Sequence, residues 1–363
     1  MTGAGRAGTE LMSVSIIAGP ASDAVLAKLN LIESKQVFRP GPRSKPEEIV
    51  AQLRSIAERR EVAHFIIQGE ADRPLMAYAF LFADDLADIL RLTSGAFAID
   101  AGVLLDCLLD RKATSLSASL IAEQMEFASD IFLGGVTDGP DLALAQSIAL
   151  ALNPRARVSP VSNAATLLDW HTTSFDFDES INGAGWRKLL DAEESISNEK
   201  VMAFSYHARQ PFHPDRFSTL LQNGLRGVFR AKGFFWLATR MEEVGGLNLA
   251  GSELQCVSAG HWWASRDVQT RESEMPERTR KEWQEPFGDR RQAFAVMALN
   301  TSRDAVQQQF DCCLLTDDEM AGGERAWQNF TDPFPSWAAH AHEHHHAHGC
   351  DHDHGSHEHD CCG

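Results

Sequence analysis

The stretch SVSIIAGPASDAVLAK, residues 13–28, decides the fold of the first half of the chain. Ser13–Ile17 is short and mostly apolar, as expected for a buried strand, and a Gly-Pro turn follows at residues 19–20. A helix is predicted to begin near Ser22 or Asp23, either of which could cap it. Helical spacing is kept by the apolar residues Val25, Leu26, Leu29 and Ile32.

The same alternation of strands and helices continues to about residue 170. Helices are expected at Glu47–Arg59, 115–126 and 140–152. Strands are expected at Val62–Ile67, Ala96–Ile99, Asp130–Leu133 and Arg157–Val161. This order predicts an α/β domain with a doubly wound parallel sheet, helices on both faces and ligands bound beyond the carboxyl ends of the strands.

The first strand–helix turn is where a phosphate-binding loop would lie, but AGPASDAVLAK (18–28) lacks the necessary chemistry. A P-loop needs two glycines around four residues, then Lys and Ser or Thr, to supply N–H groups, an ammonium group and a magnesium-binding hydroxyl. Here a single Gly precedes a Pro, the charge of Asp23 would repel a phosphate, and Lys28 lies one helical turn too far along. The turn is therefore predicted to be structural.

The net charge of −18 over 363 residues excludes several kinds of partner. Nucleic acid and anionic membranes both require a basic surface, so neither is expected to bind. No apolar run is long enough to span a bilayer, and residues 1–12 lack the apolar core of a signal peptide. This lead is expected to be disordered, with Met12 an alternative start. The seven cysteines form no obvious disulfide framework, which favours the reducing cytoplasm.

The pattern changes after the polar, acidic stretch 172–199, which is predicted to be a linker. Helices are expected at Pro214–Leu221 and Ser302–Cys312, and a mobile loop at 266–285. Strands are expected at 201–208, Val228–Thr239 (two strands broken at Lys232-Gly233), Leu254–Val257 and His261–Ala264 (a hairpin turning at 259–260), and Ala293–Leu299. These elements predict a small α+β domain, which Phe330–Trp337 closes against solvent.

Other candidate sites in this half have weak support. His207, His213 and His261 could bind a metal, but a histidine beside aromatic residues is more often a hydrogen-bonded core or rim residue. Adjacent Cys312 and Cys313 would point about 100° apart on a helix and could not readily chelate one ion together. Cys313 opens the run CLLTDDEM, and its expected place in the core rests on the family resemblance given below. The remaining expectations are packing roles for Phe234, Phe235, Trp236, Trp262 and Trp263, and a charged rim, or alternatively an interaction patch, at Asp289, Arg290 and Arg291.

The last 24 residues, HAHEHHHAHGCDHDHGSHEHDCCG, hold ten of the fifteen histidines and three of the seven cysteines. They contain no large apolar side chain, so the segment is expected to be disordered until a ligand binds. Imidazole and thiolate groups suit zinc above all, with Co²⁺ and Ni²⁺ as alternatives. The alternative interpretations are a solvated low-complexity end or a purification tag, but tags are plain histidine runs. The predicted ligands are His340, His342, His344, His345, His346, His348, Cys350, His352, His354, His357, His359, Cys361 and Cys362.

Several runs resemble one known family. They are RQPFHPDRF (209–217), FRAKGFFWLATR (229–240), WQEPFGDRRQ (283–292) and CLLTDDEM (313–320), together with the more partial matches GEADRP (69–74), EQMEFASDIFLGGVTD (123–138) and ALNPRARVSPVS (151–162). The second-half runs resemble the C-terminal domain of the CobW family of GTPases, and the first-half runs resemble parts of its GTPase domain. The resemblance implies a P-loop-GTPase-like sheet, then a CobW C-terminal domain.

The chain departs from that family at four functional motifs. The phosphate loop is absent at 18–28, and residues 135–138 (GVTD) keep only the Asp of the guanine-binding Asn-Lys-x-Asp. The metal-binding Gly-Cys-x-Cys-Cys is missing, with a short Pro-rich link at 36–46 in its place, and Gly69-Glu70 alters the end of the second strand. Each departure removes a different chemical part, so GTP hydrolysis is predicted to be lost and no GTP–magnesium cofactor is expected.

The resemblance and the tail together predict a cytoplasmic zinc-binding accessory protein or metallochaperone built on a pseudo-GTPase. Its expected partner is a client metalloprotein or an intact CobW-type paralogue. The alternatives are an active GTPase and a non-catalytic partner of an intact CobW-type GTPase. The expected organisation is a lead at 1–12, a degenerate GTPase-like domain at 13–171, a linker at 172–199, a CobW C-terminal domain at 200–337 and a metal-binding tail at 338–363.

Overall fold

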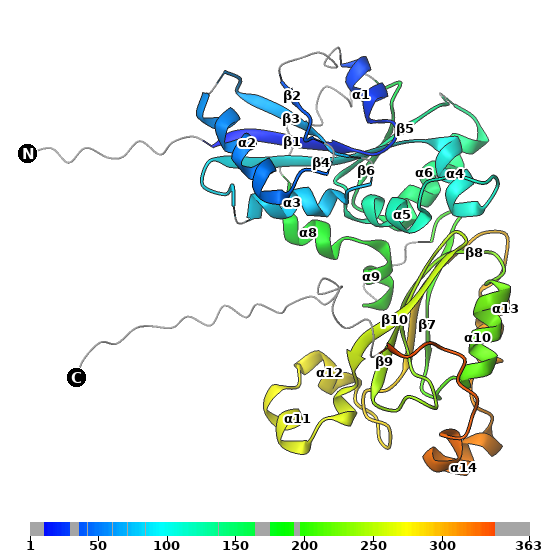
Figure 1. The fold of residues 1–363 in the computed structure, drawn as a ribbon. Helices are drawn as coiled ribbons and strands as arrows, with labels where there is room; N and C mark the ends of the chain where they lie inside the picture. Colours follow the sequence, from blue (N-terminus) through cyan, green and yellow to red (C-terminus); the bar gives the residue numbers. More distant parts are fainter. Residues whose placement is uncertain are drawn as a thin grey trace, which may run out of the picture.

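The computed structural model describes most of the chain between residues 11 and 337. The described ranges are 11–29, 36–41, 43–59, 61–70, 72–83, 85–136, 138–163, 175–191 and 197–337. They form two β-sheets, each with its own helices, placed one above the other in Figure 1. Within these ranges, no helix is both long and apolar enough to cross a membrane.

The first sheet has six strands in the order β2-β3-β1-β4-β5-β6, and every pair of neighbours is parallel. The strands are β1 (Met12–Ala18), β2 (Val37–Phe38), β3 (His64–Gln68), β4 (Leu90–Asp100), β5 (Asp130–Gly134) and β6 (Arg157–Pro160). The predicted parallel α/β sheet is therefore confirmed. The two residues of β2 lie inside the predicted Pro-rich link. A strand of two residues is too short to show a periodic pattern in the sequence.

The helices of this domain cover the two faces of the sheet unequally. They are α1 (Ser22–Lys28), α2 (Pro46–Arg59), α3 (Leu75–Ala83), α4 (Ala101–Leu109), α5 (Ala118–Phe127) and α6 (Pro140–Leu152). Val25 and Leu26 of α1 pack in a small cluster on one face, whereas α2 to α6 contribute to the large core on the other. Figure 1 shows α1 on its own side of the sheet. The N-cap of α1 is Ala21, so the predicted cap at Ser22 or Asp23 is wrong.

Two short helices, α8 (Phe177–Asn182) and α9 (Gly185–Leu190), lie within the predicted linker. The ring of Phe177 lies 4.9 Å from that of Phe80 and 6.1 Å from that of Phe127, measured between centroids. Leu189 of α9 is buried in the large core. A few well-spaced apolar side chains therefore attach this acidic stretch to the body of the protein. The predicted domain boundaries stay predictions.

The second sheet has five antiparallel strands in the order β10-β9-β8-β11-β7. Its strands are β7 (Met202–Ala208), β8 (Val228–Phe235), β9 (Glu243–Ala250), β10 (Glu253–His261) and β11 (Gln292–Ala298). Side chains of α10 (Pro214–Asn223) and α13 (Arg303–Asp311) pack against one face. The predicted small α+β domain is confirmed, and Trp337, only 4% exposed, closes its core as expected.

Two local predictions for this domain are wrong, and one strand was not predicted. β8 runs unbroken through Lys232-Gly233, since Gly233, with a φ of 154°, stays paired with both neighbouring strands. The hairpin joins β9 to β10, and residues 259–260 lie at an irregularity of β10 between Ser258 and His261. β9 was missed because its sequence EVGGLNLA carries two glycines, which are weak strand formers.

The segment predicted as a loop at 266–285 contains two helices, α11 (Val268–Glu274) and α12 (Glu277–Glu282), after the 3-10 turn η2 (Trp263–Ser265). The Asp267 side chain caps α11 by accepting a hydrogen bond from the backbone N–H of Thr270. Capping and charge interactions therefore form helices that lack an apolar stripe. The last helix, α14 (Asp317–Trp327), ends beside the closing segment.

Candidate functional site

The turn between β1 and α1 packs directly on β4. Gly19 has a φ of 100°, and a Cβ atom there would lie 2.3 Å from the carbonyl oxygen of Ala98. The backbone N–H of Ala21 donates to the same oxygen at 3.0 Å. Backbone contacts to β4 therefore hold the turn in place, and its structural role stays a prediction.

Side chains from three strand ends meet over this turn. The amide nitrogen of Gln68 donates to Ser22 Oγ at 3.0 Å and to Asp23 Oδ1 at 2.9 Å. The amide oxygen of Gln68 accepts from Arg39 Nε at 2.7 Å. The hydroxyl and the carboxylate at the start of α1 are thus engaged by a neutral amide, and Lys28 lies at the other end of the helix. No ammonium group is among the described side chains that meet over this turn.

A second polar cluster lies beyond β3, in the segment GEADRP. Glu70 Oε2 pairs with Arg73 Nε at 3.1 Å, and the backbone N–H of Glu70 donates to the Tyr78 hydroxyl at 3.0 Å. Glu70 Oε1 also accepts from the backbone N–H of Arg43 at 2.9 Å. Burial raises the pKa of Tyr78, so its hydroxyl stays neutral near pH 7. The cluster ties the end of β3 to the start of α3.

The position that resembles the guanine-binding motif follows β5. A Cβ atom on Gly134 would lie 2.5 Å from Asp100 Oδ1, and Gly135 has a φ of 77°. The two glycines therefore allow the carboxylate at the end of β4 to approach the β5 backbone closely. Asp138, the one motif residue kept, makes no hydrogen bond or ion pair that involves another described residue. Thr137 lies outside the described residues.

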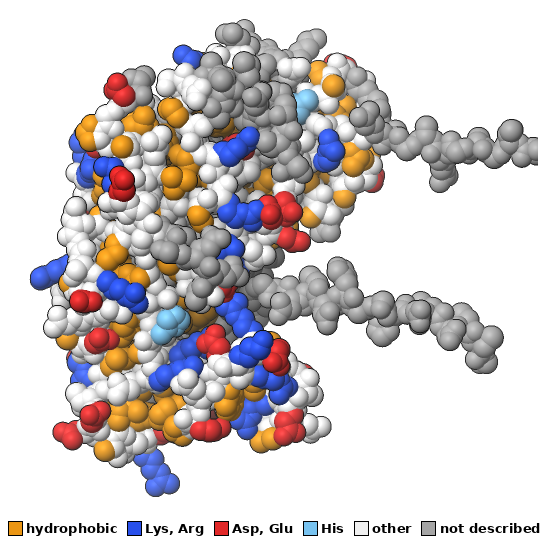
Figure 2. Space-filling view, turned by 180° about the vertical axis from the view of Figure 1, so that it is seen from behind, with side chains coloured by type: hydrophobic (Ala, Val, Ile, Leu, Met, Phe, Trp, Pro, Cys, Tyr) orange, Lys and Arg blue, Asp and Glu red, His pale blue; other side chains and the backbone are white. Residues whose placement is uncertain are grey.

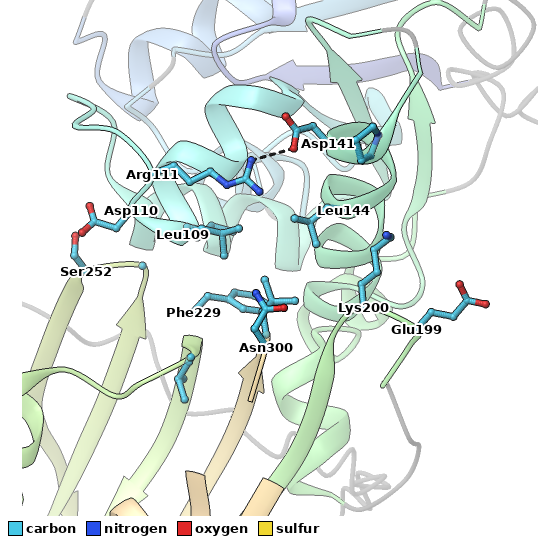
Figure 3. Close-up of a pocket in the computed structure, with 16 residues that line it drawn as sticks. Leu109, Asp110, Arg111, Asp141, Leu144, Glu199, Lys200, Phe229, Ser252 and Asn300 are labelled. Carbon is cyan, nitrogen blue, oxygen red and sulfur yellow. Dashed lines mark hydrogen bonds and ion pairs between the residues drawn. The ribbon is translucent and has the colours of Figure 1, made fainter. Parts of the chain in front are cut away.

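A cleft of about 800 Å³ opens between the two domains (Figure 3). Leu109 and Leu144 of the first domain and Phe229 of the second line its apolar part. At its rim Arg111 pairs with Asp141 at 3.0 Å, and both side chains are about half exposed. Residues far apart in the chain form this cleft, so no local motif could have predicted it.

The candidate metal ligands of the second domain do not form a site. His207 lies on β7, His213 precedes α10 and His261 ends β10. Burial lowers the pKa of both His207 and His213, and the His213 ring lies 4.5 Å from the Phe330 ring. The described ranges hold no group of three His, Cys, Asp or Glu side chains placed to bind a metal ion.

The cysteines and Asp289 also have structural roles here. Cys313 is buried as predicted, and burial raises its pKa to about 12, whereas Cys312 is exposed. Asp289 is 4% exposed and accepts hydrogen bonds from the backbone N–H groups of Trp263 and Ala264 at 2.9 Å. The predicted rim or patch role for Asp289 is therefore wrong, because this carboxylate caps the turn that follows β10.

The predicted zinc ligands lie outside the described residues, so their role stays a prediction. They are the thirteen side chains between His340 and Cys362. The described chain ends at Trp337. The guanidinium carbon of Arg240 lies over the Trp337 ring, 4.2 Å from the ring centroid. Arg240 also pairs with Asp332 at 2.8 Å, so the residues that precede the tail are fastened to the second domain.

Residues 201–314 match the family described as the cobalamin synthesis protein cobW C-terminal domain. The chain is CobW-like. It is 28% identical over 320 residues to the zinc-regulated GTPase metalloprotein activator 1 of Dictyostelium discoideum, covering 79% of this chain and 67% of that protein. It is 36% identical over 223 residues to a zinc chaperone of Mycobacterium tuberculosis, covering 61% and 54%.

This CobW-like chain thus spans about half the length of its mycobacterial relatives. The crystal structure of the Zn(II)-bound YjiA GTPase from E. coli also aligns with it, at 11% identity and a TM-score of 0.35. That alignment covers 85% of this chain and 100% of that chain. The match of residues 201–314 and the similarity to these relatives agree with the resemblance found in the sequence, which is strongest in the second domain.

Proposed function

We propose that this protein is a zinc-binding accessory protein or metallochaperone of the CobW type, and that its tail from His340 to Cys362 carries the ion. One observation carries the proposal: ten histidines and three cysteines fall within the last 24 residues of a CobW-like chain. Imidazole and thiolate are the donors that zinc prefers. The names of the Dictyostelium and mycobacterial relatives support zinc as the metal and metalloproteins as clients.

The tail would load and unload by exchange among many interchangeable ligands. Such a set gives many alternative coordination shells of similar stability, which suits a buffer or donor better than a structural site. Co²⁺ and Ni²⁺ accept the same donors and are the competing ions to include in any test. A client metalloprotein would receive the ion by ligand exchange.

A zinc titration of the intact protein and of a chain ending at Trp337 tests the tail. We expect the truncated chain to bind no more zinc than a full-length control in which the ten tail histidines are glutamine and the three tail cysteines are serine. Both should compete with a chromophoric chelator far less than the intact protein does. Equal zinc stoichiometry for the intact and truncated chains would show that the metal binds elsewhere.

We further propose that GTP hydrolysis has been lost. The support is the first turn, where the Gly19 backbone packs on Ala98 and Gln68 engages Ser22 and Asp23. Phosphate binding needs convergent N–H groups and an ammonium group, and this turn presents a carboxylate instead. The body would then act as a scaffold that carries the tail and docks on a partner.

The alternative of an active GTPase is favoured by the name of the Dictyostelium relative. Calorimetric titration with GTP and Mg²⁺ separates the two proposals, since we expect no binding in the micromolar range. If GTP did bind tightly, an Asp138→Ala variant would show whether the carboxylate kept from the guanine motif selects GTP over ATP. A third possibility, a non-catalytic partner of an intact CobW-type GTPase, predicts co-purification with such a paralogue.

A further inference from the structure

Helix α5 of the first domain is held at its N-terminal end by the second domain. Glu253, the first residue of β10, accepts hydrogen bonds from the backbone N–H groups of Ala118 at 2.9 Å and Ser119 at 3.1 Å. It also accepts from Ser117 Oγ at 2.8 Å. Burial alone would raise the pKa of Glu253, but these hydrogen bonds lower it overall. A carboxylate from one domain thus satisfies the free N–H groups of a helix in the other.

The C-terminal end of α5 is held by a buried ion pair. Arg230 of β8 meets Glu126 of α5 through two contacts, Nε to Oε1 at 2.7 Å and Nη2 to Oε2 at 3.1 Å. The side chains of Arg230 and Glu126 are only 1% and 5% exposed. Arg230 Nη1 also donates to Asn248 Oδ1 and to the Leu249 carbonyl oxygen. Separating this pair would leave a charge buried without its partner, which proteins strongly avoid.

The turn between β9 and β10 enters the first domain. Gly251 has a φ of 56°, and a Cβ atom there would lie 2.4 Å from the carbonyl oxygen of Cys107 in α4. Only glycine allows the two backbones to come this close. In Figure 1, α5 lies at the boundary between the first domain and the end of the second sheet where β8 begins.

The same helix contacts the start of α3. The Gln124 side chain of α5 accepts a hydrogen bond from the backbone N–H of Leu75, the first residue of α3, at 2.8 Å in a buried position. Tyr78 of α3 in turn holds the backbone of Glu70 beyond β3. A continuous series of polar contacts therefore joins the end of β3 to β8, through α3 and α5.

We propose that α5 is a joint, a helix whose movement couples the end of β3 to the second domain. The buried Glu126–Arg230 ion pair fixes this helix to the second domain. A shift of Glu70 beyond β3, where a ligand at the carboxyl edge would be felt, moves α3 through Tyr78 and α5 through Gln124. Arg230 and Glu253 then carry the second domain with them, because breaking the first contact strands a buried charge and breaking the second leaves the N–H groups of α5 without their acceptor. The proposal depends on neither zinc binding nor GTP hydrolysis.

Hydrogen exchange of the full-length protein tests the joint with the variant Arg230→Met. We expect backbone exchange to rise about tenfold in α5 and also in the segment 69–75, while α10 and α13 keep their protection. Arg111→Met is the matched control, because Arg111 belongs to the exposed Arg111–Asp141 pair beside the same domain seam. That control should leave exchange in α5 and in 69–75 unchanged.

Two outcomes would overturn the proposal. Faster exchange in α5 with no change in 69–75 would show that the ion pair stabilises α5 alone. An equal rise in α10 and α13 would show a general loss of stability. A second variant, Glu253→Gln, keeps the size of the side chain and weakens the other end of α5. It should speed exchange in 69–75 even if Arg230→Met fails to fold, and unchanged rates there would again contradict the joint.

Discussion

Gly19 stands where β1 turns into α1, and its backbone conformation decides how the turn packs. Its φ of 100° is one that L-residues with a side chain rarely adopt, and the space for a Cβ atom is taken by the carbonyl oxygen of Ala98. The sequence predicts a structural turn there, because a Pro and an Asp stand where phosphate-binding groups are needed. It cannot show that the turn is pressed against β4.

We predict that Gly19→Ala lowers the free energy of unfolding by at least about 2 kcal/mol, from backbone strain and the contact with Ala98. Urea denaturation followed by circular dichroism would measure it. Gly102→Ala is the control, since Gly102 lies in α4 with no atom within 4 Å of its missing Cβ. That change should stabilise the protein by roughly 0.5–1 kcal/mol. Equal stability of Gly19→Ala and the parent protein would contradict the packing described.

Cys313, which opens the run CLLTDDEM, is buried as the family resemblance implies. A charge that is buried by a partner far along the chain was not predicted. Arg230 in the strand VFRAKGFF looks like an exposed position, yet Glu126, more than 100 residues earlier, allows it to be buried. A charged side chain between apolar neighbours of one strand was the available signal for this site.

At the scale of elements, α14 shows how capping can form a helix without an apolar stripe. Thr316 and Glu319 form a capping box, in which each side chain accepts from the backbone N–H of the other. Arg216 of α10 binds both carboxylate oxygens of Glu319, at 2.7 and 2.8 Å. The hydrogen bond from Arg216 is the main reason that the pKa of Glu319 falls to about 2 from its ordinary 4.5.

We predict a pH dependence from this contact. Because the pKa of Glu319 is lowered in the folded protein, its contribution to stability is full above about pH 4.5 and is lost as the pH falls towards 2. Between pH 5 and pH 2.5, the midpoint temperature of thermal unfolding should therefore fall less steeply for Glu319→Gln than for the parent protein. Glu324→Gln, an exposed change on the same helix, should follow the parent curve. Parallel curves for Glu319→Gln and the parent would refute the role of Arg216.

The elements missed from sequence share a physical cause. Helices α3 and α4 (LMAYAFLFA and AGVLLDCLL) are apolar on nearly every side, so no 3.6-residue period appears. β9 contains Gly245-Gly246, where the ring of Phe235 on β8 fills the space above Gly245. In each case the neighbouring element, and not the local sequence, stabilises the structure.

At the scale of the whole molecule, Trp337 closes the core of the second domain. This side chain packs against Phe235 with 5.9 Å between ring centroids, under the guanidinium group of Arg240. The 26 residues that follow hold no large apolar side chain. The contacts that stabilise the second domain are therefore expected to be complete without them.

We predict that a chain ending at Trp337 unfolds within roughly 1 °C of the full-length protein, measured by differential scanning calorimetry in the presence of a chelator. The matched variant Trp337→Ala in the full chain should lower the midpoint by roughly 5–10 °C, because a buried indole is lost from the core. A large drop for the truncated chain would show that the tail itself contributes to stability.

The sequence by itself determined the two kinds of domain, the family of the second one and the composition of the tail. Strand and helix periods, turn residues and ligand types are local properties, and the chain carries them wherever it folds. Only the tertiary structure decided that α5 is held at both ends by the other domain, and that the first turn is closed by Ala98 and Gln68. Those contacts join residues 45 to 136 positions apart, and buried charges and close backbone approaches depend on the partner that folding brings to them.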